Sequence, residues 1–202
     1  MNQEEKTYWS NFYSQNKAII KPSDFAIFIC DHLKSNTNII KPIKNILDIG
    51  CGNGRDSYYF AEQEYNIVGI DASVECKASV ECKAFNNCNF VMGNMITYPK
   101  DKYDMIYSRF SIHSIPDKEI LELFKSIQNK DTLLCIETRS DKSKLEERHF
   151  GDGHYRNFTN LDNLKLMLTE CSFKIIYIEE NDGFAIYKDE NPICIRVICQ
   201  KM

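Results

Sequence analysis

A glycine-rich turn between an apolar run and a helix constrains this chain more than any other feature. Residues 45–57 read NILDIGCGNGRDS, so that Gly50, Gly52 and Gly54 follow directly after an apolar stretch. This pattern predicts a buried strand, a tight turn and then a helix. Glycine lets a ligand approach the backbone closely, and the first N–H groups of the helix face the same place. A second apolar run, NIVGID, ends in Asp71, where an acid can accept hydrogen bonds from both hydroxyls of a ribose.

Strands and helices alternate along the chain, which predicts a parallel sheet with helices on both faces. The expected strands are 45–50, 66–71, 89–93, 103–109, 132–138, 173–178 and 193–200. The expected helices are 8–13, 23–35, 54–63, 73–85, 117–128 and 160–170. The turn-rich link between the last two strands favours a hairpin. The sequence ASVECK occurs at 72–77 and again at 78–83, and we interpret this repeat as a local duplication within one helix.

Length and composition indicate a single globular domain over residues 1–202. Hydrophobic residues make up 43% and charged residues 27% of the chain, which is ordinary for a soluble protein. No apolar run reaches the roughly 18 residues of a membrane span, and the polar N-terminus is unlike a signal peptide. The net charge of −4 argues against a nucleic-acid-binding surface. Nine cysteines form no CxxC pair, so we expect reduced thiols, a cytoplasmic protein and no metal site.

The glycine pattern differs from two common nucleotide-binding motifs. It is GxGxG rather than the dinucleotide pattern GxGxxG, and it lacks the GK[ST] ending of a P-loop. A strand, GxGxG and a later acid resemble motif I of the class I S-adenosylmethionine (SAM) methyltransferases. The resemblance implies a three-layer, Rossmann-like α/β fold. Its sheet would have seven strands, mostly parallel, with an antiparallel last strand. The cofactor would be SAM, released as S-adenosyl-L-homocysteine.

The same resemblance implies where the cofactor lies. The glycine loop would wrap the amino-acid end of SAM, and Asp71 would bind the ribose. Asn94 occupies the position of a family acid that binds the adenine amino group, and its amide oxygen can still accept that hydrogen bond. Met95 would add a backbone N–H and an apolar wall. The expected cofactor-binding residues are Tyr8, Trp9, Asp48, Gly50, Cys51, Gly52, Gly54, Arg55, Asp71, Ala72, Asn94, Met95 and Ser108.

The loop after the fourth strand is expected to lie near the transferred methyl group, because ligands of open α/β sheets bind beyond the carboxyl ends of the strands. Residues 103–116, YDMIYSRFSIHSIP, are not of the NPPY or DPPY type found in some amine-methylating enzymes of this fold. His113 is a candidate general base, since the pKa of an imidazole is ordinarily near neutrality. A purely structural role for this histidine is the alternative.

Arginine is scarce and unevenly placed, with six arginines against nineteen lysines. Most lie at strand ends or in the insertion 139–158, on the expected acceptor side, whereas Arg196 is expected elsewhere. A guanidinium suits an anion because its planar fork matches a carboxylate or phosphate. The predicted substrate-binding residues are Arg109, Arg139, His154 and Arg156, and the predicted catalytic residues are His113 and Tyr155. Pairing of some arginines with local acids is the alternative. Residues 1–40 would form an N-terminal helical cap.

Three short segments give a narrower resemblance. ETRS, DGHYRNF and ENPICIRVICQK resemble a bacterial subgroup that acts in capsule and lipopolysaccharide assembly. That resemblance implies methyl transfer to a phosphate or phosphoramidate oxygen, which is already anionic and requires neither a strong base nor a metal. The acceptor would be a small molecule or a glycan-linked phosphoryl group. One alternative is a small-molecule N-, S- or O-methyltransferase acting on an amine or metabolite. Another is a SAM-binding protein without transfer activity.

Overall fold

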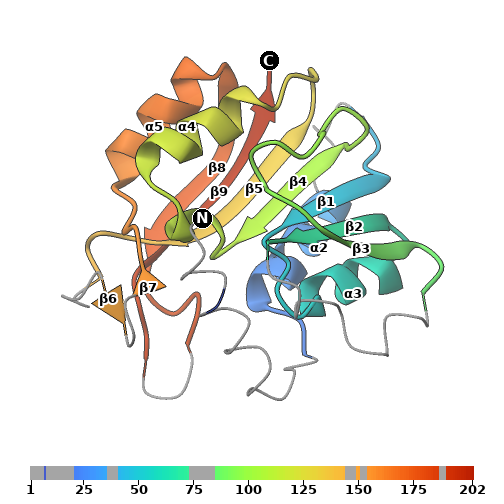
Figure 1. The fold of residues 1–202 in the computed structure, drawn as a ribbon, viewed down its shortest axis with the longest axis horizontal. Helices are drawn as coiled ribbons and strands as arrows, with labels where there is room; N and C mark the ends of the chain where they lie inside the picture. Colours follow the sequence, from blue (N-terminus) through green and yellow to red (C-terminus); the bar gives the residue numbers. More distant parts are fainter. Residues whose placement is uncertain are drawn as a thin grey trace.

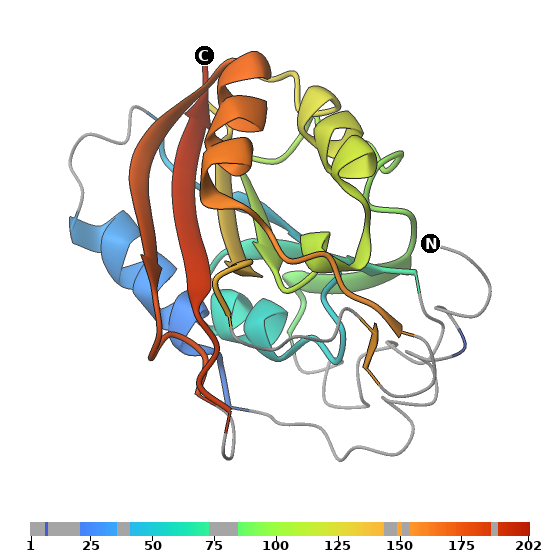
Figure 2. The ribbon, with the colours of Figure 1, turned by 90° about the vertical axis from the view of Figure 1, so that its left-hand side faces the viewer.

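The computed structural model describes residues 7, 21–35, 41–72, 85–143, 149–150, 154–186 and 190–202. A central sheet separates two helical layers, with α2 and α3 on one face and α4 and α5 on the other (Figures 1 and 2). The helices are α2 (Asp24–Ser35), α3 (Arg55–Glu62), α4 (Asp117–Lys125) and α5 (Leu161–Glu170), with a short 3-10 turn η2 (Ile112–Ser114). The strands of the main sheet are β1 (Asn45–Ile49), β2 (Asn66–Asp71), β3 (Cys88–Met92), β4 (Met105–Arg109), β5 (Leu133–Arg139), β8 (Phe173–Asn181) and β9 (Cys194–Lys201).

The sheet has the strand order β3-β2-β1-β4-β5-β9-β8. The first five strands in this order pair in parallel, and β9 pairs antiparallel with both β5 and β8. β9 therefore runs against all the others, as the sequence predicts for the last strand. The predicted hairpin of the last two strands is also confirmed. Every predicted strand and each described predicted helix is present, with ends within three residues of the expected ones.

Some sequence predictions fall on residues that the structure does not describe. They include the helix over 8–13, nearly all of the helix over 73–85, and the ASVECK duplication. Of the predicted cap, residues 24–35 form α2. The insertion 139–158 contains a two-stranded ribbon of β6 (His149–Phe150) and β7 (His154–Tyr155).

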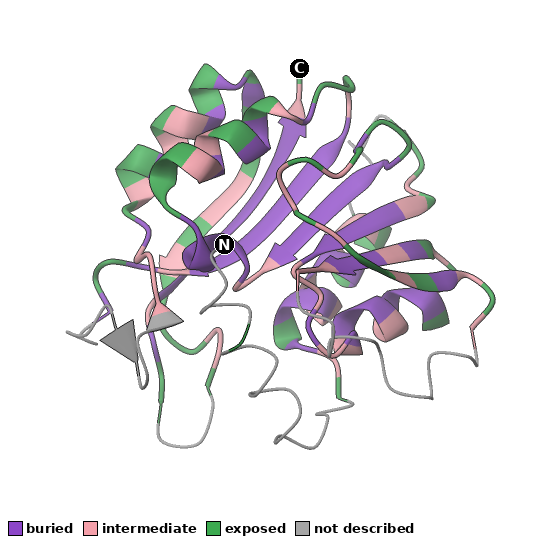
Figure 3. Ribbon diagram, in the orientation of Figure 1, coloured by how far each residue is buried: buried purple, intermediate pink, exposed green. Residues whose placement is uncertain are grey.

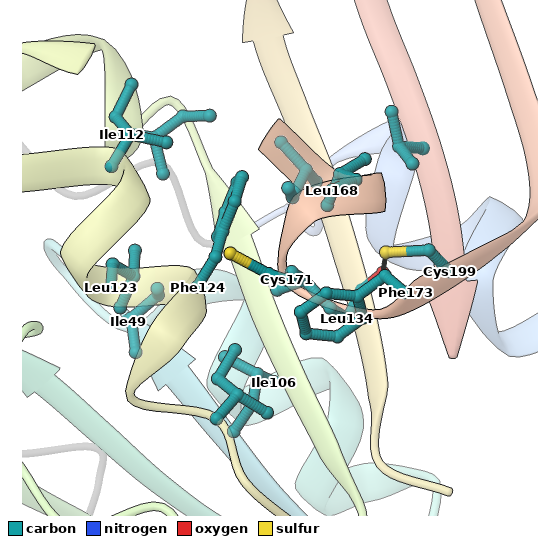
Figure 4. Close-up of a cluster of buried hydrophobic side chains, with 14 of the residues drawn as sticks. Ile49, Ile106, Ile112, Leu123, Phe124, Leu134, Leu168, Cys171, Phe173 and Cys199 are labelled. Atoms are coloured by element: carbon teal, nitrogen blue, oxygen red, sulfur yellow. Dashed lines mark hydrogen bonds between the residues drawn. The ribbon is translucent and has the colours of Figure 1, made fainter. Parts of the chain in front are cut away.

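The core lies in two apolar clusters, one on each face of the sheet. The face toward α4 and α5 packs Leu134 and Ile106 against Phe124 and Leu168 (Figure 4). The opposite face packs Tyr107 against helices α2 and α3. The central strands are buried along most of their length (Figure 3), because helices cover both sides of a parallel sheet. Polar side chains inside these strands are therefore costly unless paired, and they mark the site.

No disulfide bond joins the seven described cysteines, six of which are buried. Among the described helices, none combines the length and apolar character that crossing a bilayer requires.

Candidate functional site: a glycine loop and an arginine-rich acceptor side

The glycine loop turns over the ends of β1 and β2. Gly50, Gly52 and Gly54 have φ values of 70°, 56° and 77°. Residues other than glycine rarely adopt this left-handed region of backbone conformation. The backbone N–H groups of Gly50 and Cys51 both donate to the carbonyl of Ile70, at 2.8 and 3.0 Å. The loop is therefore held at the end of β2 by its own backbone hydrogen bonds. Its backbone conformation, with positive φ at three positions, requires glycine.

Two of the glycines also allow close packing. A Cβ on Gly50 would lie 2.4 Å from the Cβ of Ser111, and one on Gly54 would lie 2.6 Å from the ring of Phe90. These distances are too short for any side chain. Gly50 thus brings the cofactor loop into contact with the loop that follows β4, on the expected acceptor side.

The loop and its surroundings fit the two ends of SAM. Helix α3 begins without a side-chain cap at Gly54, so the N–H groups of its first turn suit a carboxylate. Asp71, half-buried at the end of β2, accepts a hydrogen bond of 3.1 Å from the N–H of Gly52 through Oδ2. A carboxylate has about four acceptor positions, so Asp71 is chemically suited to accept hydrogen bonds from ribose hydroxyls.

Asp48 lies in the interior of β1, directly before the loop. Its carboxyl group is 2% exposed and accepts a 2.5 Å hydrogen bond from the hydroxyl of Ser57 in α3. Burial raises the pKa of Asp48 to about 8; the hydrogen bond from Ser57 opposes this rise, and the charges of Asp56 and Asp71 add to it. Asp48 therefore couples the strand to the first turn of the helix as a protonated acid near neutral pH.

We expect Asp48 to make stability fall as pH rises. The folded-state pKa of about 8 lies above the reference value of 3.8, so the unfolded chain releases this proton first. The contribution is complete below about pH 4 and is lost as pH rises toward 8. Asp48→Asn keeps an acceptor for Ser57 but does not titrate, so its midpoint of thermal unfolding should decline less between pH 5 and 8. The exposed Asp101→Asn serves as control. Parallel curves for wild type and Asp48→Asn would contradict the prediction.

A second buried acid, Asp56 in the first turn of α3, joins three elements next to the glycine loop. Its carboxylate accepts hydrogen bonds from the N–H and hydroxyl of Ser23, at 2.7 and 2.8 Å, and from the hydroxyl of Tyr107 at 2.8 Å. The contacts join α3 to β4 and to the start of α2. Arg55 lies 3.8 Å from Asp56. Asp56 was not among the residues predicted from the sequence, although an acid in the first helical turn is a common N-terminal signal.

The turn after β3 carries Asn94 and Met95, which are predicted to contact the adenine of SAM. The N–H of Gly93 donates to the carbonyl of Asp71 at 2.8 Å, which brings this turn beside the end of β2. Asn94 is exposed, and its amide oxygen accepts a 2.8 Å hydrogen bond from the N–H of Ile96. Met95 is half-buried and packs against the core. Ala72, also half-buried, follows Asp71. Tyr8 and Trp9 lie outside the described residues.

Phe110 lies at the centre of the predicted acceptor side, and it was not among the residues predicted from the sequence. It has a φ of 52°, unusual for a bulky residue. The guanidinium carbons of Arg109 and Arg139 lie 4.5 and 5.7 Å from the centre of its ring. The ring of His113 stacks on it at 5.8 Å. One aromatic ring therefore contacts three of the predicted acceptor-side residues at the ends of β4 and β5.

The insertion returns to the same place. The backbone N–H of Asn157 donates to the carbonyl of His113 at 2.6 Å, and the Asn157 side chain donates to Ile115 and Asp117. Arg156 and Tyr155, one and two positions earlier, are half-buried. The structure thus brings the predicted catalytic residues His113 and Tyr155 into one region together with Arg156. The side chain of His154 lies outside the described residues.

The remaining predicted residues have mixed surroundings. Ser108 is buried, and its hydroxyl lies 2.5 Å from that of Ser111. Arg109 donates from Nε to Glu137 at 2.8 Å, and Arg139 donates from Nη2 to Glu190 at 3.1 Å. The expectation that Arg196 lies apart from the other arginines is wrong. Because β9 pairs antiparallel with β5, Arg196 stands opposite Glu137 and donates to it at 2.6 Å.

Within the described residues, no group of three or more histidine, cysteine and acidic side chains is arranged to bind a metal ion. A site without metal stays a prediction.

The strand order, the single reversed strand and the glycine loop are those of the SAM-dependent methyltransferase fold. Solved structures share the fold. One is a SAM-dependent methyltransferase from Methanosarcina mazei, with a TM-score of 0.65, 18% identity, and coverage of 82% of this chain and 95% of that one. Another is the magnesium protoporphyrin IX methyltransferase of Synechocystis with S-adenosylhomocysteine bound, with a TM-score of 0.66, 15% identity, and coverage of 98% of this chain and 94% of that one.

Residues 25–178 match the methyltransferase domain family. The chain belongs to this family, and its cofactor is SAM. A phosphoethanolamine N-methyltransferase from Triticum aestivum is 36% identical over 151 residues, which cover 70% of this chain and 30% of the wheat protein. The chain thus spans less than a third of the length of the curated relatives it matches.

Proposed function

We propose that the domain transfers the methyl group of SAM to a small acceptor that carries a phosphate group. The observation that carries this proposal is the grouping of Arg109, Arg139 and His113 around Phe110. Nη1 of Arg139 is buried and has no hydrogen-bond partner within the described part of the chain. A buried donor without a partner is costly, and a phosphate oxygen is a suitable acceptor for it. The names of the relatives, phosphoethanolamine N-methyltransferases, support a phosphorylated substrate.

The nucleophile of first choice is the amine of such a phosphorylated compound. SAM supplies an electrophilic methyl group on its sulfonium sulfur when bound. The protein then has to orient the amine in line, exclude water and accept a proton. An ammonium group has to lose its proton before it can attack. His113, held by Asn157 through its backbone carbonyl, is the group that we assign to receive this proton.

A second candidate is methylation of a phosphate or phosphoramidate oxygen in capsule or surface polysaccharide assembly, in the cytoplasm. The segments ETRS and DGHYRNF support it. Each segment contributes a described residue near the predicted acceptor side: Arg139 contacts the ring of Phe110, and Asn157 donates to the carbonyl of His113. An anionic oxygen needs no base, so Arg139 and Arg156 would bind the non-attacking oxygens and His113 would only position the group.

A panel of acceptors tests both candidates. Purified protein with labelled SAM is offered phosphoethanolamine, ethanolamine, a sugar phosphate and a phosphoramidate. We expect methylation of phosphoethanolamine and not of ethanolamine, because only the former offers a phosphate to the arginines. Methyl transfer to the sugar phosphate or phosphoramidate alone would favour the second candidate. Transfer to ethanolamine with phosphate-bearing compounds ignored would refute the proposal.

His113→Asn distinguishes the two nucleophiles. For an amine, we expect kcat to fall about 100-fold or more, within the usual range for loss of a general base, and the acidic limb of the pH–rate profile to disappear. For a phosphoryl oxygen, kcat should fall less than about tenfold and the profile should keep its shape. The titrated binding of SAM is the control, since His113 lies on the acceptor side. A loss of SAM binding equal to the loss of rate would exclude a role in proton transfer.

A further inference from the structure

A fully buried acid links three strands beneath the acceptor side. Glu137 is 0% exposed in β5 and accepts hydrogen bonds from Nε of Arg109 at 2.8 Å and from Nε of Arg196 at 2.6 Å. Arg109 in β4 and Arg196 in β9 stand opposite Glu137 in the registers of the two neighbouring strands. We call these three residues the buried ion triad. It spans the sheet one row inside Arg139.

The two arginines differ in what else they contact. Arg196 is 6% exposed, donates from Nη2 to the carbonyl of Phe184 at 3.1 Å, and packs on the rings of Phe25 and Phe184. Its guanidinium is thus enclosed. The side chain of Arg109 is 19% exposed and lies over Phe110, the ring that also contacts His113. Arg109 is therefore the outward member, and its bond to Glu137 uses Nε and leaves the Nη nitrogens for other contacts.

General energetics do not favour a buried ion triad over apolar packing. Two charges taken out of water incur a desolvation cost that their attraction often fails to offset, and apolar side chains of similar volume are frequently as stabilising. The neighbouring inward positions of the same strands are apolar: Cys135 in β5 and Ile198 in β9 are buried. Burial raises the pKa of Glu137, and the charges of Arg109 and Arg196 oppose that rise. Arg109 and Arg196 thus favour the charged form of Glu137, against the cost of burial.

We propose that Glu137 and Arg196 are positioning residues that fix Arg109 beside Phe110, where its Nη nitrogens bind the phosphate of the acceptor. Arg196 binds Oε2 of Glu137, and Oε1 of Glu137 orients Arg109. The guanidinium of Arg109 then supplies positive charge at the end of β4. Arg139, on the same ring, provides the second cation. This inference rests on the proposed phosphate-bearing acceptor and names the residues that set its recognition.

Glu137→Gln tests the inference. Glutamine keeps one acceptor oxygen but loses the charge and the second acceptor, so Arg109 loses its fixed orientation. With the acceptor identified by the panel, we expect KM for that acceptor to rise about tenfold, kcat to change less than about threefold, and the Kd for SAM to stay within about twofold. The matched control is Asp104→Asn. Asp104 is also a buried acid with a cationic partner, Lys41 at 2.6 Å. It directly precedes β4 and therefore lies at the end of the parallel strands opposite to Arg109.

Arg196→Lys tests the same positioning role if Glu137→Gln does not fold. Lysine keeps the charge but lacks the planar guanidinium that donates to Glu137 and to the carbonyl of Phe184 at the same time. We therefore expect KM for the acceptor to rise about threefold and SAM affinity to stay unchanged. A purely structural triad would lower the midpoint of thermal unfolding and leave KM as in wild type. That result in either folded variant overturns the inference.

Binding of inorganic phosphate to the wild-type protein, measured by calorimetry with S-adenosylhomocysteine present, separates this inference from the proposed function. Wild-type protein that neither binds phosphate nor methylates a phosphorylated acceptor refutes the proposed function and the inference with it. Wild-type protein that does both, with an unchanged KM in the variants, refutes the inference alone.

Discussion

Replacing Asp71 by alanine is expected to weaken SAM binding about 100-fold. Asp71 ends β2 beside the glycine loop and holds the N–H of Gly52. A hydrogen bond to a charged group contributes about 1.5–3 kcal/mol, so losing two ribose hydroxyl contacts removes at least about 3 kcal/mol, and each 1.4 kcal/mol is a factor of ten in Kd. Isothermal titration with SAM and with S-adenosylhomocysteine measures the effect.

Two companion variants make this result specific. Asp71→Asn keeps an oxygen that can accept the Gly52 N–H but loses the charge, so we expect a smaller loss of about tenfold. Asp101→Ala removes an exposed acid before β4, at the other edge of the sheet, and should bind SAM as wild type does. Normal SAM binding by Asp71→Ala would contradict the assignment of the cofactor site.

The second large effect is expected for Gly54→Ala. The new Cβ would lie 2.6 Å from the ring of Phe90 at a φ of 77°. A positive φ costs a non-glycine residue roughly 1–2 kcal/mol, and overpacking costs typically about 1–3 kcal/mol more. We therefore expect the free energy of unfolding to fall by about 2–5 kcal/mol, measured by urea denaturation, together with weaker SAM binding because α3 begins at this residue.

Gly183→Ala is a control with the same backbone strain. Gly183 has a φ of 78° in the link between β8 and β9, but no atom lies within 4 Å of a Cβ built there. Only the strain applies, so about 1–2 kcal/mol should be lost and SAM affinity should not change. The difference between the two variants isolates the contact with Phe90. Equal losses would show that this contact does not decide the requirement for glycine.

The fold and the cofactor loop could be predicted because their signals are local. Three glycines after an apolar run determine a turn with positive φ, and the alternation of strands and helices determines the layers. The reversed last strand followed from the family resemblance and not from any property of residues 193–200 alone. The paired ends of β8 and β9 agree with the turn-rich link between them.

The acceptor side could be predicted only in part, because it depends on contacts between distant residues. Arg109 and Arg139 end β4 and β5 as expected, but their partners Glu137 and Glu190 depend on strand register and on a hairpin. Phe110 looked like an ordinary apolar residue, since a positive φ leaves no trace in the sequence for a phenylalanine. Arg196 was expected elsewhere because its contact with Glu137 depends on the register of β9 against β5, which the sequence alone does not give.

The reversed direction of β9 has a consequence for how acceptor preference can change. Its first residues lie beside the end of β5, so that Arg196, together with Glu190 before the strand, contacts Glu137 and Arg139 from the last quarter of the chain. The glycine turn and Asp71 belong to the first half. The C-terminal hairpin thus adds to the predicted acceptor side and not to the glycine turn, so we expect its exchange to change acceptor preference more than SAM binding.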